Sequence, residues 1–408
     1  MTKKRYVFLI LILGSLSALG PFSIDMYLPG FLAIAKDLNT SVARVSLSLS
    51  SYFIGISAGQ LLYGPLLDRF GRKKPLYMGL MLYVLASAAC LFTHSVDTLI
   101  ALRFVQAIGS CAAAVAAVAM VRDLFPIEDN AKVFSLLLLV LGASPMIAPT
   151  LGGYVIAAFG WQAVFLILTL LGTLILLASF LWLPESYQPD ASYSLKPKPI
   201  LTKFWLVLRE PQFYTYALAG AVTFSGLFAY VAGSAQVFMG MYKVSGQAYG
   251  WIFALLSVGF IGSSQLNSIA LRYFRSEQII PMALLSQSII GLCFLVSALL
   301  GLLGLFSTIG FLFAFLCCLG FTNPNTSALS LAPFANNAGI ASALMGALQM
   351  GIGSLASVGV SLCNTESALP MISIMAVGAT GALLILLVGR RMIVRPVVEE
   401  GQPAPIFH

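Results

Sequence analysis

The amino-acid sequence predicts an all-helical membrane protein with twelve transmembrane helices in two six-helix halves. Three observations predict this fold class: 59% of the 408 residues are hydrophobic, only 9% are charged, and the hydrophobic residues occur in long unbroken runs. A soluble domain carries roughly a quarter charged residues, so this chain has too little polar surface to be one. The runs match the about 20 apolar residues that a membrane helix needs, and they lack the alternation of a membrane β-strand.

The first apolar run follows Lys3, Lys4 and Arg5 and is longer than the apolar part of a secretory signal. We therefore expect it to remain in the protein as the first span, surrounded by the lipid bilayer. Eleven similar runs follow it, separated by polar connections. In chain order, the expected spans are residues 6–28, 42–65, 75–93, 98–121, 132–157, 162–183, 213–238, 248–270, 280–301, 305–329, 338–362 and 368–389.

The distribution of positive charge predicts the orientation in the membrane. All but four of the 22 lysines and arginines fall in segments on the same side as the N-terminus; Lys36, Arg44 and Lys243 lie on the other side and Arg103 lies within a span. Cytoplasmic loops carry an excess of Lys and Arg, so both termini are expected in the cytoplasm. The net charge of +8 therefore reflects topology. No basic stripe interleaved with aromatics suggests a nucleic-acid partner.

One connection is longer and more polar than the others and separates span six from span seven. It predicts an N-terminal bundle, a cytoplasmic linker, a C-terminal bundle and a cytoplasmic tail. Two six-span repeats of this kind place a substrate site near the middle of the membrane, between the halves. The expected boundaries are residues 1–184, 185–212, 213–395 and 396–408.

A faint internal repeat supports duplication. The loop after span two contains Arg69 and Arg72, and the loop after span eight contains Arg272 and Arg275 at the same spacing. An aromatic residue follows the first arginine in both loops. Arginine is also common beside membrane helices for topological reasons.

The loop after span two is the most specific motif. It reads Gly-Pro-Leu-Leu-Asp-Arg-Phe-Gly-Arg-Lys-Lys-Pro over residues 64–75 and resembles the loop signature of the major facilitator superfamily. Glycines permit a tight turn and close helix approach, and the aspartate can form ion pairs with the neighbouring cations. The resemblance implies that this loop holds the two halves together in the outward-open state and does not bind substrate. The gating residues expected from it are Gly64, Asp68, Arg69, Gly71 and Arg72.

Arg103 and Asp25 are the charged residues placed deep within apolar runs. An arginine in the bilayer core costs about 2.5–3.5 kcal/mol, so Arg103 is expected to face the bundle interior with a partner, and Asp25 is the one plausible acid. Arg103, Gln106 and Gly109 resemble the span-four signature of the same superfamily, in which the arginine takes part in proton coupling. A static buried ion pair that only orders spans one and four is the structural alternative.

The segment from Gly20 to Pro29, which contains Asp25 and Tyr27, resembles the first-span signature of the drug:proton antiporters. It is especially similar to the bicyclomycin-resistance branch, which includes chloramphenicol and florfenicol exporters. Whether Asp25 meets Arg103 or water then decides whether it holds a proton. Ser17, two turns earlier, offers no second charge, so we expect a single proton per cycle and neutral or zwitterionic substrates.

Span five contains Pro145, Pro149, Gly152 and Gly153. Small residues let membrane helices approach closely, and neighbours re-satisfy the backbone that proline breaks. The run resembles the antiporter signature G-x-x-x-G-P-x-x-G-G, which is typical of exporters, although Ser-Pro and Ala-Pro replace its Gly-Pro. Generic Gly/Pro packing is the alternative.

The C-terminal half has no deep charge, but its spans contain amides and aromatics that suit a cavity for amphipathic ligands. For any single aromatic, core or lipid contact is the more common role. No phosphate-binding loop, nucleophile–base pair or metal cluster is visible, so no enzyme activity, cofactor or metal is expected. The candidate cavity residues are Tyr27, Gln106, Phe228, Gln236 and Asn325.

Taken together, the sequence predicts a monomeric secondary transporter of the bacterial inner membrane. The expected activity is proton-coupled efflux of small amphipathic drugs, similar to chloramphenicol or bicyclomycin, by alternating access. The main alternative is a dedicated exporter of an endogenous metabolite such as a siderophore or amino acid. An importer or a non-transporting receptor is less compatible with the motifs.

Overall fold

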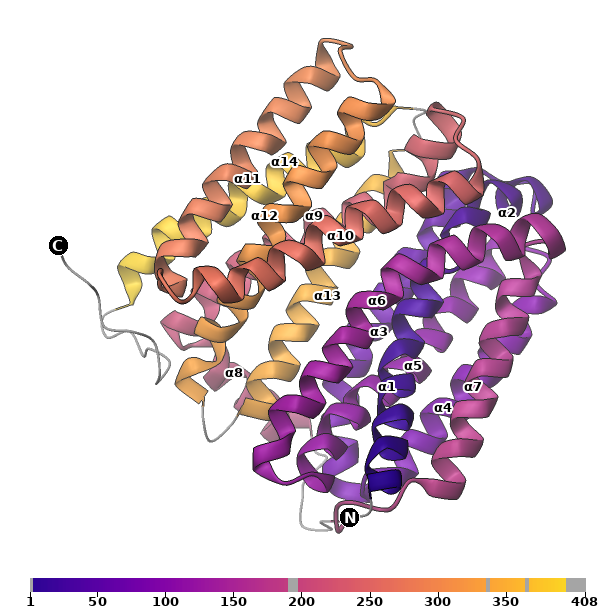
Figure 1. The fold of residues 1–408 in the computed structure, drawn as a ribbon, viewed down its shortest axis with the longest axis vertical. Coiled ribbons are helices and arrows are strands. Elements are labelled where there is room, and N and C mark those ends of the chain that lie inside the picture. The colour runs from indigo at the N-terminus through magenta and orange to yellow at the C-terminus, as the bar shows by residue number, and fades with distance from the viewer. Residues whose placement is uncertain (1–2, 190–196, 335–337, 364–366, 394–408) are drawn as a thin grey trace. The chain divides into compact units, whose positions relative to one another are not determined.

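The computed structural model describes residues 3–189, 197–334, 338–363 and 367–393, which are almost entirely helical (Figure 1). Twelve helices within these ranges are long and apolar enough to cross a membrane, which confirms the predicted fold class. In chain order, the elements are α1 (Lys3–Asp25), η1 (Leu28–Gly30), α2 (Phe31–Asp37), α3 (Val42–Phe70), α4 (Lys73–Leu91), α5 (Val96–Leu124), α6 (Ile127–Phe159), α7 (Gln162–Trp182), α8 (Pro197–Leu208), α9 (Pro211–Ala235), η2 (Gln236–Met241), α10 (Gly246–Ala270), α11 (Ser276–Leu299), α12 (Leu305–Leu331), η3 (Ala332–Phe334), α13 (Ala338–Leu362), α14 (Leu369–Gly389) and η4 (Arg390–Met392).

The first span is longer than predicted and is interrupted. It continues to Asp37, whereas the sequence suggested an end at residue 28. Helix α1 contains Pro21 and ends at Asp25, and Pro29 lies in the first turn of η1. Proline lacks the backbone N–H that a helix interior needs, but it is tolerated in a first turn. The helix therefore stops and restarts, and Asp25 lies at the break.

The linker contains a helix that the sequence analysis did not predict. Helix α8 starts with Pro197 and carries Pro199 in its first turn, where backbone N–H groups have no helical partner to lose. Val207 is buried in a cluster with residues of α9 and α13, and Phe204 packs against the same cluster. The sequence analysis described residues 185–212 only as a long polar linker.

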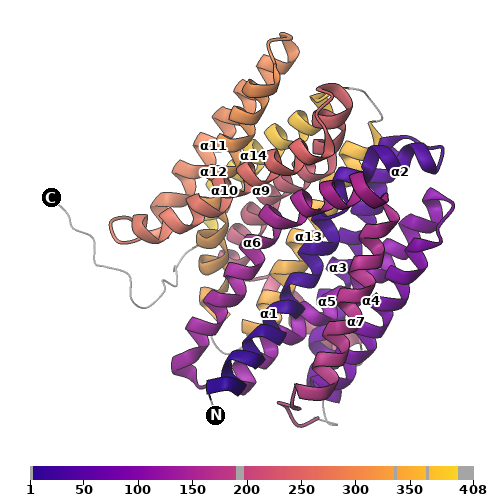
Figure 2. The same cartoon turned by 45° about the vertical axis from the view of Figure 1, so that its right-hand side comes forward.

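The helices form two compact units. Unit 1 contains the described residues up to Pro199 together with Lys243–Ala254, and unit 2 contains Ile200–Tyr242 together with the described residues from Leu255 onward. In unit 1, α5 packs against α3, α4 and α1. In unit 2, α9 packs against α13 and α14, and α11 lies beside α12 and α14 in both views (Figures 1 and 2).

Small residues allow the close helix contacts of unit 1. A Cβ atom added to Gly55 of α3 would lie 2.6 Å from the Cβ atom of Ala107 in α5, and one added to Gly79 of α4 would lie 2.2 Å from that of Ala112. Such contacts require glycine at the crossing points. They bring α5, which carries Arg103, close to α3 and α4.

Candidate functional site

Asp25 is buried at the break of the first span. Only 5% of its surface is exposed. Its carboxyl group forms no hydrogen bond or ion pair with any residue whose side chain the structure describes. An unpaired buried carboxyl group is unusual because burying a charge without a partner costs free energy.

Arg103 is fully buried in α5 and does not pair with Asp25. Its Nη1 donates to Gln106 Oε1 at 2.5 Å, and its Nη2 donates to the Ser23 carbonyl oxygen at 2.7 Å. The guanidinium carbon lies 4.4 Å from the ring centroid of Tyr27 and 4.2 Å from that of Tyr52. Arg103 thus lies in the bundle interior, as expected. Of the two possibilities that the sequence left open, contact of Asp25 with Arg103 or with water, the structure does not show the ion pair.

The reason for this arrangement is local. Ser23 lies in the last turn of α1, where carbonyl oxygens lack helical partners and the helix dipole is negative. These carbonyls are good acceptors for a cation. Two aromatic faces add cation–π attraction in this buried site. The Arg103 guanidinium is therefore stabilised by the Ser23 main-chain carbonyl, the Gln106 amide and two aromatic rings. Its Nε has no hydrogen-bond partner among the described residues.

A set of buried hydroxyl and amide groups holds the partners of Arg103 in place. Tyr27 and Gln106, predicted as cavity residues, belong to this set and are almost fully buried. The sequence analysis missed the rest because isolated serines and tyrosines in apolar runs carry no spacing signal. The bonds join Ser23 Oγ to Tyr83 Oη at 2.7 Å, Gln106 Nε2 to Ser87 Oγ at 2.7 Å, Tyr27 Oη to Ser48 Oγ at 2.8 Å and Tyr52 Oη to Ser110 Oγ at 2.7 Å.

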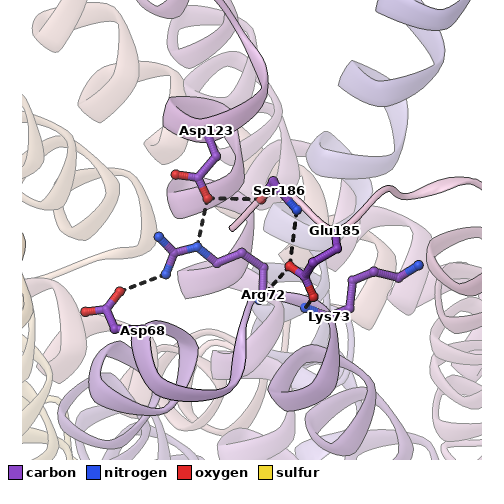
Figure 3. Close-up of polar contacts among 6 residues, drawn as sticks. All are labelled: Asp68, Arg72, Lys73, Asp123, Glu185 and Ser186. Atoms are coloured by element: carbon purple, nitrogen blue, oxygen red, sulfur yellow. Dashed lines mark hydrogen bonds and ion pairs between the residues drawn. The ribbon is translucent and has the colours of Figure 1, made fainter. Parts of the chain in front are cut away.

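The loop between α3 and α4 forms a second charged centre (Figure 3). Arg72 is 8% exposed and lies between two carboxylates: its Nη1 donates to Asp68 Oδ1 at 2.9 Å and its Nε to Asp123 Oδ2 at 2.8 Å. Burial lowers the pKa of the Arg72 guanidinium, but the hydrogen bonds to Asp123 and Asp68 outweigh burial, so the pKa is raised. The predicted pairing of Asp68 with a cation of its own loop is therefore present. Asp123 joins it from the end of α5.

Glu185, which follows α7, was not predicted as part of this centre. Its two carboxylate oxygens accept the backbone N–H groups of Arg72 and Lys73, at 2.8 and 3.1 Å (Figure 3). These two N–H groups lie at the start of α4, where helical N–H groups have no partner within the helix. The Glu185 carboxylate accepts hydrogen bonds from them and interacts favourably with the positive end of the helix dipole. These hydrogen bonds join residues more than 110 positions apart in the sequence, so no local sequence pattern reveals them.

Ser186 and Tyr187 extend the same centre. Ser186 Oγ donates to Asp123 Oδ2 at 3.0 Å (Figure 3), and the Tyr187 ring centroid lies 4.3 Å from the Arg72 guanidinium carbon. The end of α7 is thus joined to the α3–α4 loop through side chains. We name the set Asp68, Arg72, Asp123 and Glu185 the loop network.

The two glycines of the loop motif have different roles. Gly71 ends α3 with φ 81°, and a Cβ atom there would lie 3.0 Å from Glu185 Oε2. Gly64 lies inside α3, and a Cβ atom there would meet nothing within 4 Å. The expected turn and close approach therefore hold for Gly71 and are wrong for Gly64. Arg69, in the last turn of α3, lies 5.8 Å from the Phe70 ring centroid.

Helix α6 carries the predicted antiporter motif, with Pro145 and Pro149 inside the helix. A Cβ atom on Gly152 would lie 1.9 Å from the carbonyl oxygen of Met26, and one on Gly153 would lie 2.7 Å from that of Gly246. The motif thus places α6 directly against the break beside Asp25 and against the start of α10, both within unit 1.

The remaining candidate cavity residues, Phe228, Gln236 and Asn325, lie in unit 2. Gln236 begins the π-helical turn η2. Phe228 is buried against Gly353, where a Cβ atom would lie 2.3 Å from its ring. Asn325 Nδ2 donates to Asn267 Oδ1 at 2.7 Å, so this amide is used within the bundle.

Comparison with known proteins supports a transporter family. The sequence model of the Major Facilitator Superfamily matches residues 11–358. The chain is 34% identical over 378 residues to a bicyclomycin resistance protein homolog of Haemophilus influenzae, which covers 91% of this chain and 92% of that protein. It is 28% identical over 276 residues to a chloramphenicol resistance protein of Pseudomonas aeruginosa, with 67% and 65% covered.

Among solved structures, a bacterial homolog of the human lysosomal transporter Spinster, in an inward-facing and unoccupied conformation, is similar with a TM-score of 0.68. Its sequence is 15% identical, and the alignment covers 95% of this chain and 96% of that chain. At this identity the likeness shows the fold alone.

These findings confirm the predicted resemblance to the superfamily and to the bicyclomycin-resistance proteins. They also confirm that the protein belongs to a class of transporters and not to a class of enzymes. The relatives and the twelve apolar helices place the protein in the bacterial inner membrane as a multi-pass protein with a small-molecule substrate. The chain belongs to the Major Facilitator Superfamily.

Proposed function

We propose that this protein exports small amphipathic drugs in exchange for protons, and that Asp25 carries the proton. The supporting observation is that Asp25 is buried and has no partner among the side chains that the structure describes, while the nearby cation Arg103 is bonded to other groups. The drug-resistance relatives favour export of antibiotics such as chloramphenicol.

The chemistry of exchange follows from this position. A buried carboxyl group is more easily accommodated when neutral than when ionised, because burying an unpaired charge is costly. When alternating access opens the site to water, hydration lowers the free energy of the ionised carboxylate, and the proton can leave. Asp25 lies at a helix break, next to residues that have few helical hydrogen bonds to lose.

Arg103 is proposed to act as a positioning residue for Asp25. By binding the Ser23 carbonyl oxygen at 2.7 Å, it fixes the end of α1 relative to α5, and thereby the depth of Asp25. The loop network is proposed to act as a gate, as the family motif implies. We further propose a monomer with both termini in the cytoplasm, on the distribution of Lys and Arg.

The test uses inverted membrane vesicles from a strain that lacks its own drug pumps. Adding chloramphenicol to vesicles that contain the wild-type protein is expected to release protons from the vesicles. Cells of the same strain that express the protein are expected to resist the drug. Asp25→Asn should abolish both effects. The matched control is Asp97→Asn, which removes an acid that is exposed at the surface. Unchanged proton release in Asp25→Asn would overturn the assignment.

A double-mutant cycle tests the separate roles of Asp25 and Arg103. If they formed an ion pair in the resting protein, removing one partner would cost about 3–5 kcal/mol and removing both would recover most of it. The contacts predict a coupling energy for unfolding below about 1 kcal/mol between Asp25→Asn and Arg103→Gln. Strong recovery in the double variant would contradict the proposed mechanism.

A further inference from the structure

The second half of the chain repeats the arginine pair of the α3–α4 loop without its acids. Arg272 and Arg275 lie in the turn between α10 and α11, at the spacing of Arg69 and Arg72. In the first loop, Arg72 is neutralised within the protein by two carboxylates. In the second loop, no equivalent carboxylates neutralise Arg272 and Arg275 within the described residues.

One of the missing acids can be identified by its position. Asp68, four residues before Arg72, corresponds to Leu271, four residues before Arg275. In the part of the chain that the structure describes, neither Arg272 nor Arg275 forms an ion pair. The Nε atom of Arg275 is buried and has no hydrogen-bond partner there. Glu277 is near in sequence, but its Oε2 is also buried and unpaired.

Two further arginines lie at the same end of unit 2. The Arg390 guanidinium donates to the main-chain carbonyl of Glu277, which fixes the end of α14 against the start of α11. Arg391 follows and is exposed, without an ion pair in the described ranges. We name Arg272, Arg275, Arg390 and Arg391 the arginine cluster; it occupies the point where α10 and α14 end and α11 begins.

The surroundings of the arginine cluster are those of a membrane surface. Tyr273 and Phe274 lie between the first two arginines and are 78% and 51% exposed. Below the cluster, each of the three helices presents an exposed apolar side chain within two turns: Ile269 of α10 is 52% exposed, Met282 of α11 64% and Val388 of α14 61%. Aromatics at the interface and bare apolar faces beneath them are typical of lipid contact.

We propose that the arginine cluster binds the phosphate group of an anionic phospholipid, with phosphatidylglycerol as the representative headgroup. Guanidinium groups bind phosphate oxygens through paired charge-assisted hydrogen bonds. Basic groups next to membrane helices attract anionic lipids strongly. The acyl chains lie on the exposed faces of α10, α11 and α14, which a soluble phosphate compound does not use. The proposal is independent of the transported substrate.

The proposal is tested by titrating the purified full-length protein in detergent with dioleoyl phosphatidylglycerol and counting bound lipid by native mass spectrometry. Wild-type protein should bind this lipid in preference to phosphatidylcholine. Each basic residue near an anionic surface contributes about fivefold, so Arg272→Gln/Arg275→Gln should weaken binding about 30-fold. The exposed Arg391→Gln should weaken it about fivefold.

Three controls make the outcome decisive. Arg272→Lys/Arg275→Lys keeps the charge but loses the paired hydrogen bonds, so its affinity should lie between that of the wild type and that of Arg272→Gln/Arg275→Gln. Lys36→Gln/Lys243→Gln removes two exposed cations from unit 1 and should leave affinity unchanged. Inorganic phosphate should not displace the lipid. Wild-type affinity in both glutamine variants of the cluster, equal binding of phosphatidylcholine, or displacement by inorganic phosphate would overturn the proposal.

Discussion

Replacing Gly71 by alanine should destabilise the protein strongly, although the change adds a single methyl group. Gly71 has φ 81° and ψ 173°, a backbone region that is essentially restricted to glycine and costs other residues about 1–3 kcal/mol. The new Cβ atom would also lie 3.0 Å from Glu185 Oε2 and weaken its charge-assisted bonds to the start of α4. Each such bond contributes about 1.5–3 kcal/mol. We expect Gly71→Ala to lower the free energy of unfolding by about 2–4 kcal/mol.

Two other glycines separate the contributions. Gly160 has φ 83° and ψ 169°, but a Cβ atom there would approach only Gln162 Oε1, at 3.3 Å. Gly160→Ala should therefore show the backbone strain alone, about 1–3 kcal/mol. Gly64→Ala meets nothing within 4 Å and lies inside α3, so it should stabilise the protein by about 0.5–1 kcal/mol.

The assay is denaturant unfolding of the purified protein in detergent, followed by circular dichroism, with drug resistance measured in parallel. Gly71→Ala should lose resistance because it disturbs the loop network, whereas Gly160→Ala should keep it. The reasoning fails if Gly71→Ala unfolds within about 0.5 kcal/mol of wild type, the range of ordinary surface changes. It also fails in part if Gly71→Ala and Gly160→Ala cost the same, because Glu185 then contributes nothing.

The remaining predictions concern buried contacts of unit 1, and thermal unfolding in detergent measures each of them. Gly152→Ala should cost more than about 3 kcal/mol and abolish resistance, since its Cβ atom would lie 1.9 Å from the Met26 carbonyl oxygen; a functional variant would show that α6 can move away. Trp161→Phe removes the bond from Nε1 to Asp37 Oδ2 at 2.9 Å and should cost about 1 kcal/mol; no loss of stability would mean that Asp37 is satisfied without the indole. Tyr52→Phe keeps the ring beside the buried arginine and should cost about 1 kcal/mol, whereas Tyr52→Leu should cost about 2 kcal/mol more; equal losses would argue against the cation–π contact.

The spans could be predicted from the sequence because the bilayer imposes one length and one composition on every helix. The structure reproduces all twelve, within a few residues at most boundaries. The first span is the main exception, because a proline interruption such as Pro29 looks like an end when only apolar length is counted. Helix α8 was missed for the related reason that Pro197 and Pro199 suggest a loop unless they fall in a first turn.

The candidate site was predictable where the chemistry is local. Asp68 and Arg72 belong to one short loop motif and are four residues apart, so a contact between them could be expected from the sequence, although α3 ends at Phe70 between them. Glu185 contacts the same loop from more than 110 residues away, and its position after α7 gave no sign of a role. A carboxylate shortly after a span is common at membrane surfaces, so only the fold distinguishes Glu185 from the other acids.

The sequence offered Asp25 as the one plausible acidic partner of Arg103, because elimination considered only charged residues. In the structure, an amide, a main-chain carbonyl and aromatic rings contact Arg103. Burial of an arginine in a bilayer costs about 2.5–3.5 kcal/mol. Two cation–π contacts contribute about 0.5–2 kcal/mol each, and the bonds to Gln106 and the Ser23 carbonyl contribute about 1.5–3 kcal/mol each. These contacts offset the cost without a carboxylate.

This arrangement distinguishes a static ion pair from a device that can exchange a proton. In a static pair, protonation of Asp25 would release Arg103 and loosen α1 from α5. In the structure, Arg103 holds the main chain of α1 through Ser23, and the Asp25 carboxyl group has no bond to any described side chain. The order of spans one and four therefore comes from Arg103, but it does not depend on the charge of Asp25. Asp25 can change its protonation without breaking the contact that holds the two helices together.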